Sequence, residues 1–241
     1  MVAISPGQIE FCNLTNAMPQ PSNAMTRTKS LRPEPRDGDA TRARLLDIAF
    51  AEVHAHGYQG LRVDSLLEKA KLTKGAFYHH FQSKQALGLA IIDEVLAGMA
   101  ELVWGQHLAQ FDDPLLGIES SISFAVSMLG ERCTTLGCPI NNLAQEMSGI
   151  DDAFRVRLDT VFKNIVANIA AALERGKRHG IVRADVETTA AATFILAGTE
   201  GTVGLAKSAR SPAVLDLAMR EMKRYLDGLR ADGRATSGGT Q

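Results

Sequence analysis

The segment from Val63 to Leu87 constrains the fold more than any other part of this sequence. It contains two short helical patterns, Val63–Ala70 and Lys74–Phe81, separated only by Lys71, Leu72 and Thr73. A turn this short sets two helices at a steep angle, so that the second helix can project from the surface. The hydroxyl group of Thr73 is placed to cap the second helix. The segment therefore predicts a small helical module with one protruding helix.

The protruding helix combines a packing face with a face suited to a groove. Phe77 and Phe81 lie four residues apart and therefore on one side of the helix, where they would anchor it on the core of the module. Small residues in the first turn would let the helix approach a groove wall closely, and polar side chains one turn later would reach into that groove. Those small and polar positions are Lys74, Gly75, Ala76, Tyr78 and His79.

These residues resemble a known family signature. The run Thr73–Phe81, followed by Ser83, Lys84 and Leu87, is similar to the recognition-helix pattern of the TetR/AcrR family of transcriptional regulators. The similarity covers residues 41–92 well and extends weakly over the rest of the chain. One departure is Lys71, because the family usually has glycine there. A left-handed backbone at Lys71 would cost about 1 kcal/mol.

The resemblance implies a fold, a partner and a mechanism. It implies a homodimer that places one recognition helix from each subunit in successive major grooves of a palindromic operator. It also implies a small-molecule effector in the body of the protein that alters the spacing of the two heads. We therefore expect a sequence-specific DNA-binding transcriptional regulator, acting as a repressor that a small molecule or an electrophile releases from its operator.

Individual DNA contacts follow from residue chemistry. Lys74 and His79 are the best candidates for contacts with base edges, whereas Thr41, Lys74, Tyr78 and Lys84 are expected to contact phosphates. Lys84 also lies where a helix N-terminus can meet a phosphate. The alternative is that these side chains are only solvated or packed. The full set of predicted DNA-binding residues is Thr41, Thr73, Lys74, Gly75, Ala76, Tyr78, His79 and Lys84.

The rest of the chain shows helical periodicity throughout, which predicts an all-α fold with about nine helices. We expect a three-helix helix-turn-helix domain at residues 41–86 and a helical effector-binding and dimerisation domain at 87–230. Residues 1–40 and 231–241 read as disordered tails, since the first is rich in proline and the second in Gly, Ser and Thr. The predicted helix caps and starts in the larger domain are Asp113 (with a helix to about Thr135), Asp151, Asp185 and Ser211.

Charge and composition narrow the remaining possibilities. Residues 1–92 carry 11 Lys and Arg against 8 Asp and Glu, and residues 93–241 carry 15 against 19, so the first part is basic and the second acidic. This polarity permits a nucleic-acid contact near the N-terminus. The three cysteines and the absence of a secretory or membrane-spanning pattern favour the cytoplasm. No cofactor and no metal is expected, because Cys133 and Cys138 have no further partner at a zinc-like spacing.

Two other function classes stay open at this point. One is a DNA-binding protein of the same fold with a role outside transcription, which would bind operators without affecting neighbouring promoters. The other is an all-α enzyme, although no phosphate-cradling glycine loop or nucleophile elbow is present in the sequence. Turnover of a substrate would distinguish the enzyme from a regulator.

The effector site is predicted in two alternative forms. Pro139 suits the first turn of a helix, which places Cys138 near its N-cap, where the helix end would favour a reactive thiolate. Cys138 would then sense an electrophile or oxidant, unless it is simply a small buried residue. Alternatively, apolar side chains would line a pocket for a reversible ligand, or form ordinary core. The candidate effector-binding residues are Cys138, Asn141, Phe124, Met128 and Phe162.

The last two helices are expected to form the dimer interface. Small residues on one face of the first of them would let helices approach closely. A leucine-rich face on the second, from Leu215 to Leu229, would complete a two-fold four-helix arrangement. The alternative is a close contact within one subunit. The small residues are Ala190, Ala197, Gly201 and Gly204.

Overall fold

The structure is a computed structural model that describes residues 37–231, and these residues form an all-α fold, as predicted. The N-terminal head contains α1 (Asp37–His56), α2 (Val63–Ala70) and α3 (Lys74–His80). The first helix starts four residues before the predicted position, whereas α2 and α3 match the predicted segments closely. The parts of the two predicted tails at 1–36 and 232–241 lie outside the described residues.

One long, nearly continuous helical segment leads from the head into the body. It consists of α4 (Lys84–Ala90), a π-helical stretch (Ile91–Leu96), α5 (Ala97–Ala100), a second π-helical stretch (Glu101–His107) and a final 3₁₀ turn (Leu108–Gln110). The backbone N–H of Ala86 donates to Ser83 Oγ over 3.0 Å, so Ser83 caps the start of this segment. Buried aliphatic side chains along its length tie the head and the body to one core.

Six further helices complete the body. They are α6 (Pro114–Leu129), α7 (Arg132–Thr135), α8 (Pro139–Met147), α9 (Asp152–Arg178), α10 (Thr188–Ala209) and α11 (Pro212–Leu229). The predicted caps Asp113, Asp151 and Ser211 are confirmed, because each side chain accepts hydrogen bonds from the first backbone N–H groups of its helix.

Two predicted helix boundaries in the body were wrong. The helix that begins at Pro114 does not continue to Thr135, because Gly130 has a positive φ of 56° and ends α6. The cap of α10 is Glu187 and not Asp185, since the Glu187 carboxylate accepts hydrogen bonds from Thr189 and Ala190. In the first case a glycine with positive φ ended the helix early, and in the second a carboxylate two residues after the predicted start supplied the cap.

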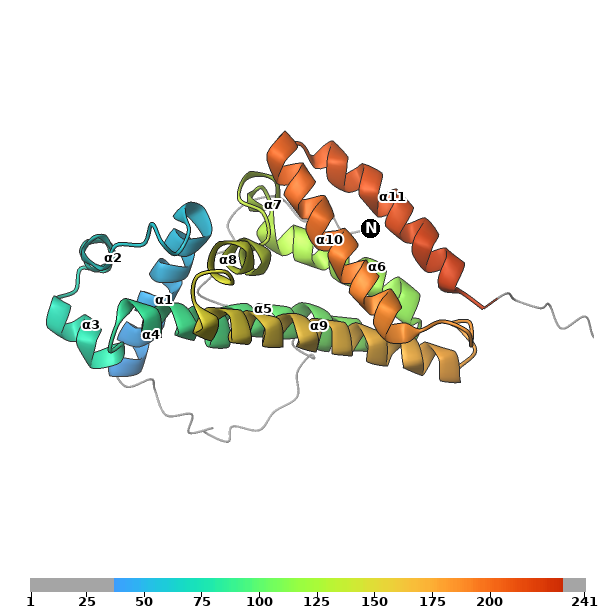
Figure 1. The fold of residues 1–241 in the computed structure, drawn as a ribbon, viewed down its shortest axis with the longest axis horizontal. Coiled ribbons are helices and arrows are strands. Elements are labelled where there is room, and N and C mark those ends of the chain that lie inside the picture. The colour runs from blue at the N-terminus through green and yellow to red at the C-terminus, as the bar shows by residue number, and fades with distance from the viewer. Residues whose placement is uncertain (1–36, 232–241) are drawn as a thin grey trace, which may run out of the picture.

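The helices are arranged so that the head sits at one end of an elongated molecule (Figure 1). The long helix α9 and the segment containing α5 run side by side along the molecule. Helix α10 packs on α9 and crosses the body towards α7, with α11 on its outer side, and α8 lies in the middle, between the head and the rest of the body. Within the described residues, β structure is limited to a single bridge between Val182 and Arg230.

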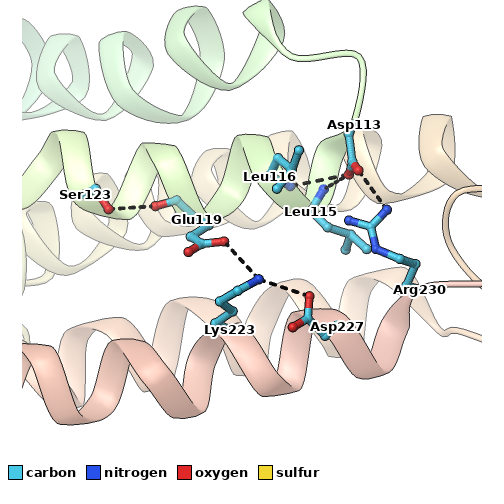
Figure 2. A network of polar contacts seen from close by, with 8 residues as sticks. All are labelled: Asp113, Leu115, Leu116, Glu119, Ser123, Lys223, Asp227 and Arg230. Carbon is cyan, nitrogen blue, oxygen red and sulfur yellow. Dashed lines mark hydrogen bonds and ion pairs between the residues drawn. The ribbon is translucent and has the colours of Figure 1, made fainter. Parts of the chain in front are cut away.

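Polar contacts hold the end of α11 against the start of α6 (Figure 2). The Arg230 guanidinium lies 2.7 Å from an Asp113 carboxylate oxygen, and Lys223 lies 3.8 Å from Glu119 and 3.3 Å from Asp227. Burial would raise the pKa of Asp113, but Arg230 and two backbone N–H donors outweigh it and lower that pKa. These contacts stabilise the end of the body that is farthest from the head.

None of the helices within residues 37–231 combines the length and apolar character needed for a membrane span.

Candidate nucleic-acid interface and effector cavity

The packing face of α3 is the one predicted from its two phenylalanines. Phe77 and Phe81 are buried, with ring centroids 5.9 Å apart. The neighbouring Tyr78 is 56% exposed and meets the Phe77 ring edge-on. The buried aromatic pair therefore fixes the helix on the head and turns its polar face to solvent.

The turn before α3 is built as the sequence predicts, including the strained position. Lys71 has a left-handed backbone with φ of 53°, and the N–H groups of Lys71 and Leu72 return to carbonyl oxygens of the last turn of α2. Thr73 Oγ1 accepts a hydrogen bond from the Ala76 N–H over 3.3 Å, which confirms it as the cap of α3. The turn thus holds α2 and α3 at a fixed angle.

The predicted DNA-binding residues lie in or next to the head at positions that solvent reaches at least partly. Tyr78 is joined there by the other α3 candidates, while Thr41 lies near the start of α1 and Lys84 at the start of α4. The exposed residues are Thr73, Lys74, Gly75, Tyr78 and His79, and the half-buried ones are Thr41, Ala76 and Lys84. The geometry fits a helix that enters a groove of duplex DNA, and the individual contacts stay predictions.

Lys74 has a carboxylate partner within the head. Its Nζ lies 2.9 Å from the Asp64 carboxylate, and both side chains are about 70% exposed. The hydrogen bond and the charge of Asp64 raise the pKa of Lys74. An exposed ion pair of this kind contributes little to stability, so Lys74 can exchange Asp64 for another anion at small cost.

Lys84 folds back onto the head instead of extending into solvent. Its Nζ donates to the Gln59 carbonyl oxygen over 3.2 Å and lies 4.7 Å from the centre of the Tyr58 ring. Burial lowers the pKa of Lys84. A phosphate contact by this lysine would require it to give up or share these two contacts.

The short helix α8 connects the head to the body, and the sequence did not reveal this role. Glu146, in its last turns, accepts hydrogen bonds from the backbone N–H groups of Tyr58 and Gln59 over 2.9 and 2.7 Å. The turn that precedes α8 is held by His54 of α1, whose Nε2 donates to the Gly137 carbonyl oxygen over 2.9 Å. Both ends of α8 therefore contact the end of α1 and the loop after it.

The N-terminal end of α8 also closes a largely apolar cavity in the body. The cavity has a volume of about 70 Å³. Of the predicted effector-binding residues, Met128 and Cys138 line it, whereas Phe124, Asn141 and Phe162 are not among its lining residues. Phe124 instead stacks on His107 with centroids 4.5 Å apart. The acidic residue in the lining is Glu200 of α10, which the sequence did not reveal as part of a site.

Cys138 occupies the predicted N-cap of α8, but its thiol is not activated. Burial and the nearby Glu200 carboxylate raise the pKa of Cys138 well above its usual range. Hydrogen bonds from the backbone N–H groups of Ile140 and Asn141 act in the opposite direction and are outweighed. The expectation that the helix end would favour a thiolate was therefore wrong for this conformation, because desolvation dominates.

The exposed face of α10 matches the predicted small-residue surface. Ala190, Ala197, Gly201 and Gly204 are all exposed, and a Cβ atom added at Gly201 or Gly204 would meet nothing within 4 Å. The leucine face of α11 was assigned wrongly to this surface, because Leu215, Leu226 and Leu229 are buried within their own subunit. Larger apolar side chains that are exposed on the same two helices are Phe194, Leu205 and Leu217.

Comparison with known proteins agrees with this architecture. Residues 45–91 match the model for bacterial regulatory proteins of the tetR family, and residues 117–222 match a tetracyclin repressor-like C-terminal domain. The chain is 28% identical over 189 residues to the transcriptional regulator AcuR of Cereibacter sphaeroides, covering 78% of this chain and 86% of that protein. It is 25% identical over 190 residues to the transcriptional repressor NemR of Escherichia coli K12, covering 77% and 94%.

A solved structure shows the same fold over most of the described chain. A TetR transcriptional regulator from Chloroflexus aurantiacus superimposes with a TM-score of 0.73 at 28% identity, covering 81% of this chain and 98% of that one. The head, the long connecting helix and the helical body are thus all shared with solved regulators. The two matched domains, these relatives and the exposed face of α3 place the chain in the TetR family of DNA-binding transcriptional regulators.

Proposed function

We propose that this regulator is a homodimeric repressor that inserts α3 of each subunit into the major grooves of a palindromic operator. The observation that carries the proposal is the division of α3 into two faces. Phe77 is fully buried, while Lys74, Tyr78 and His79 on the same short helix are exposed. Such a helix offers a cation and hydrogen-bonding groups to phosphates and base edges without losing its own packing.

The proposed dimer uses the exposed surface of α10 and α11. Gly201 and Gly204 leave the backbone of α10 open to close approach. The same two helices carry exposed apolar side chains, among them Phe194 and Leu217, and a second copy of the chain would bury them. A dimer of this kind holds its two heads at a spacing that the bodies determine, which a palindromic site with two half-sites requires.

Release from DNA is proposed to start in the cavity beside α8. A small molecule in this cavity would contact Cys138 and Ile140 at one end of α8, and the other end holds the head through Glu146. A shift of α8 would therefore reposition the head relative to the body. If the effector favours a head spacing that misfits the operator, DNA weakens effector binding by the same factor as the effector weakens DNA binding.

Modification of Cys138 by an electrophile is the second proposed route to release. Cys138 lines the cavity, so an adduct on its sulfur would occupy the same space as a reversible ligand. Because the pKa of this thiol is raised, the modification requires a conformation in which the cavity opens to solvent. The repressor would act in the cytoplasm, where its DNA target lies.

The test is DNA binding by the purified full chain, measured by fluorescence anisotropy on duplexes from the region that flanks its own gene. We expect one palindromic segment to bind more tightly than scrambled duplexes, with an affinity that falls steeply with salt. Equal affinity for all duplexes would contradict the proposal.

To separate the two effector routes, an electrophile such as N-ethylmaleimide is added to wild type and to Cys138→Ser. Release only in wild type supports the covalent route, and equal release in both excludes it.

A further inference from the structure

The cavity beside α8 contains one polar group that its own surroundings do not satisfy. The Oε2 atom of Glu200 is buried and has no hydrogen-bond partner among the described residues. The other contact of this carboxylate is with the Cys138 thiol, whose S–H group donates to it. A buried carboxylate oxygen without a partner is costly, and such atoms are rare in folded proteins.

The side chains around Glu200 offer no compensating positive charge. The cavity is lined by methionine, tryptophan, aliphatic and cysteine side chains, together with Thr199 and Glu200, and its lining includes no Lys, Arg or His. The hydroxyl of Thr199 is already used, since it donates to the Ile195 carbonyl oxygen over 2.8 Å. In the described residues no salt bridge involves Glu200. Burial raises the pKa of Glu200, so this carboxylate is stabilised either by a proton or by a donor that a molecule in the cavity supplies.

The rest of the lining determines what such a molecule looks like. Trp104 presents an aromatic ring, which attracts cations over its face, and Met99 and Met128 are flexible apolar side chains that adapt to a ligand. The volume of about 70 Å³ is roughly half of the ~150 Å³ that accommodates a benzene ring. The cavity thus takes a short hydrocarbon chain that ends in a group able to donate to a carboxylate, and a chain of four carbons enters when the flexible Met99 and Met128 side chains move aside.

We propose that the cavity binds a small aliphatic amine as its ammonium ion, with Glu200 as the counter-ion and the Met99, Trp104 and Met128 side chains around the hydrocarbon part. One consequence of this inference rests on the proposed function: amine binding is then expected to weaken the affinity of the protein for DNA. The binding itself is a property of the free protein. It excludes carboxylate ligands, which Glu200 would repel, and leaves hydrocarbons without a polar group as weak ligands.

The experiment is isothermal titration calorimetry of the full chain, free of DNA, with three matched four-carbon probes: n-butylamine, 1-butanol and butyrate. We expect n-butylamine to bind at least tenfold more tightly than 1-butanol, and butyrate to show no binding. Glu200→Gln should reduce the affinity for n-butylamine at least tenfold and bring it to the level of 1-butanol. Glu131→Gln, which removes an exposed carboxylate on the loop before α7, is the control and should leave all three titrations unchanged.

Folding is not expected to confound the result. Glu200→Gln removes an uncompensated buried charge, so its thermal midpoint should equal or exceed that of wild type, and Glu200→Asp provides a second variant that keeps the charge. Retention of amine binding in Glu200→Asp together with its loss in Glu200→Gln supports charge recognition. Equal binding of n-butylamine and 1-butanol, or unchanged amine binding in Glu200→Gln, would overturn the proposal.

Anisotropy on the operator separates the inference from the proposed function. If n-butylamine binds the free protein through Glu200 but leaves DNA affinity unchanged, the amine site stands and the release mechanism fails. If another molecule releases the DNA while n-butylamine does not bind, the release mechanism stands and the amine site fails.

Discussion

The Nε2 atom of His54 lies 2.9 Å from the carbonyl oxygen of Gly137, and this hydrogen bond joins the first helix of the head to the turn that begins α8. Gly137 has a positive φ of 84°, so the chain turns sharply there and presents its carbonyl to the imidazole. The next residue, Cys138, lines the cavity. One buried histidine thus connects the DNA-binding head with the cavity wall.

His54 makes the stability of the head dependent on pH. Burial lowers the pKa of His54 below 6.5, and the charges of Arg132 and Lys207 act in the same direction. The hydrogen bond to Gly137 opposes this shift but is outweighed. As the pH falls, the unfolded chain therefore binds a proton at this position before the folded chain does. The stability that neutral His54 contributes is thus present above pH 6.5 and is lost as the pH falls below that value. We expect the free energy of unfolding, measured by urea titration between about pH 7.5 and 5.5, to fall more in wild type than in His54→Gln. His56→Gln, on the exposed side of the same helix, should follow the wild-type curve. A parallel pH dependence in wild type and His54→Gln would contradict this prediction.

Glu146 is predicted to transmit the effector signal and to stabilise the head. Glu146→Ala leaves the N–H groups of Tyr58 and Gln59 without their present acceptor, which should cost about 1–3 kcal/mol. It should also reduce the effect of any effector on DNA affinity, because one of the two links between α8 and the head is removed. Urea unfolding and operator anisotropy with and without effector measure both effects. Gln145→Ala, an exposed neighbour on α8, is the control, and an equal effector response in Glu146→Ala and wild type would refute the role in transmission.

The turn between α2 and α3 is predicted to gain stability from glycine. Lys71 has a left-handed backbone, so Lys71→Gly should raise the free energy of unfolding by about 1 kcal/mol. Glu68→Gly, at an exposed position inside α2, should instead lower it by about 1 kcal/mol. Denaturant unfolding of the three proteins compares the two changes, and a loss of stability in Lys71→Gly would show that the left-handed backbone is not the dominant effect.

The helices and the head could be predicted from sequence because their signals are local. Caps such as Thr73, Asp151 and Ser211 and the paired rings of Phe77 and Phe81 act within one or two turns of a helix, so residue spacing suffices to find them. Family resemblance supplied the DNA-binding role. The end of α6 was missed because Gly130 ends the helix earlier than the apolar pattern suggested.

The cavity could not be predicted in the same way, because its walls come from distant parts of the chain. Glu200 looks like an ordinary polar residue in a small-residue helix, and its Oε2 atom is buried only because Cys138 and the apolar cavity walls pack around it. Phe124 and Phe162 are residue types that often line a ligand pocket, but in this fold neither of them lines the cavity. A buried carboxylate cannot be predicted from sequence alone, because its burial depends on which other elements of the fold pack against it.

Asp64 is predicted to compete with DNA for Lys74. Because the two exposed side chains form an ion pair, Asp64→Asn should free Lys74 and remove one negative charge from the interface. We expect tighter binding to all duplexes, roughly threefold to tenfold at moderate salt, and a steeper dependence of log K on log[salt]. Asp159→Asn, which breaks the Lys163–Asp159 pair on α9 in the body, is the matched control. Unchanged or weaker DNA binding by Asp64→Asn would place Lys74 outside the interface.

The most direct test of the account is the operator affinity of wild type, Lys74→Ala and His79→Ala, measured by fluorescence anisotropy at several salt concentrations on the preferred palindrome and on its single-base variants. We predict that Lys74→Ala weakens binding and lowers the salt slope by about one per subunit, and that His79→Ala costs about 1–3 kcal/mol and relaxes preference at one position of each half-site. If both variants bind every duplex as wild type does, α3 is not the helix that reads DNA.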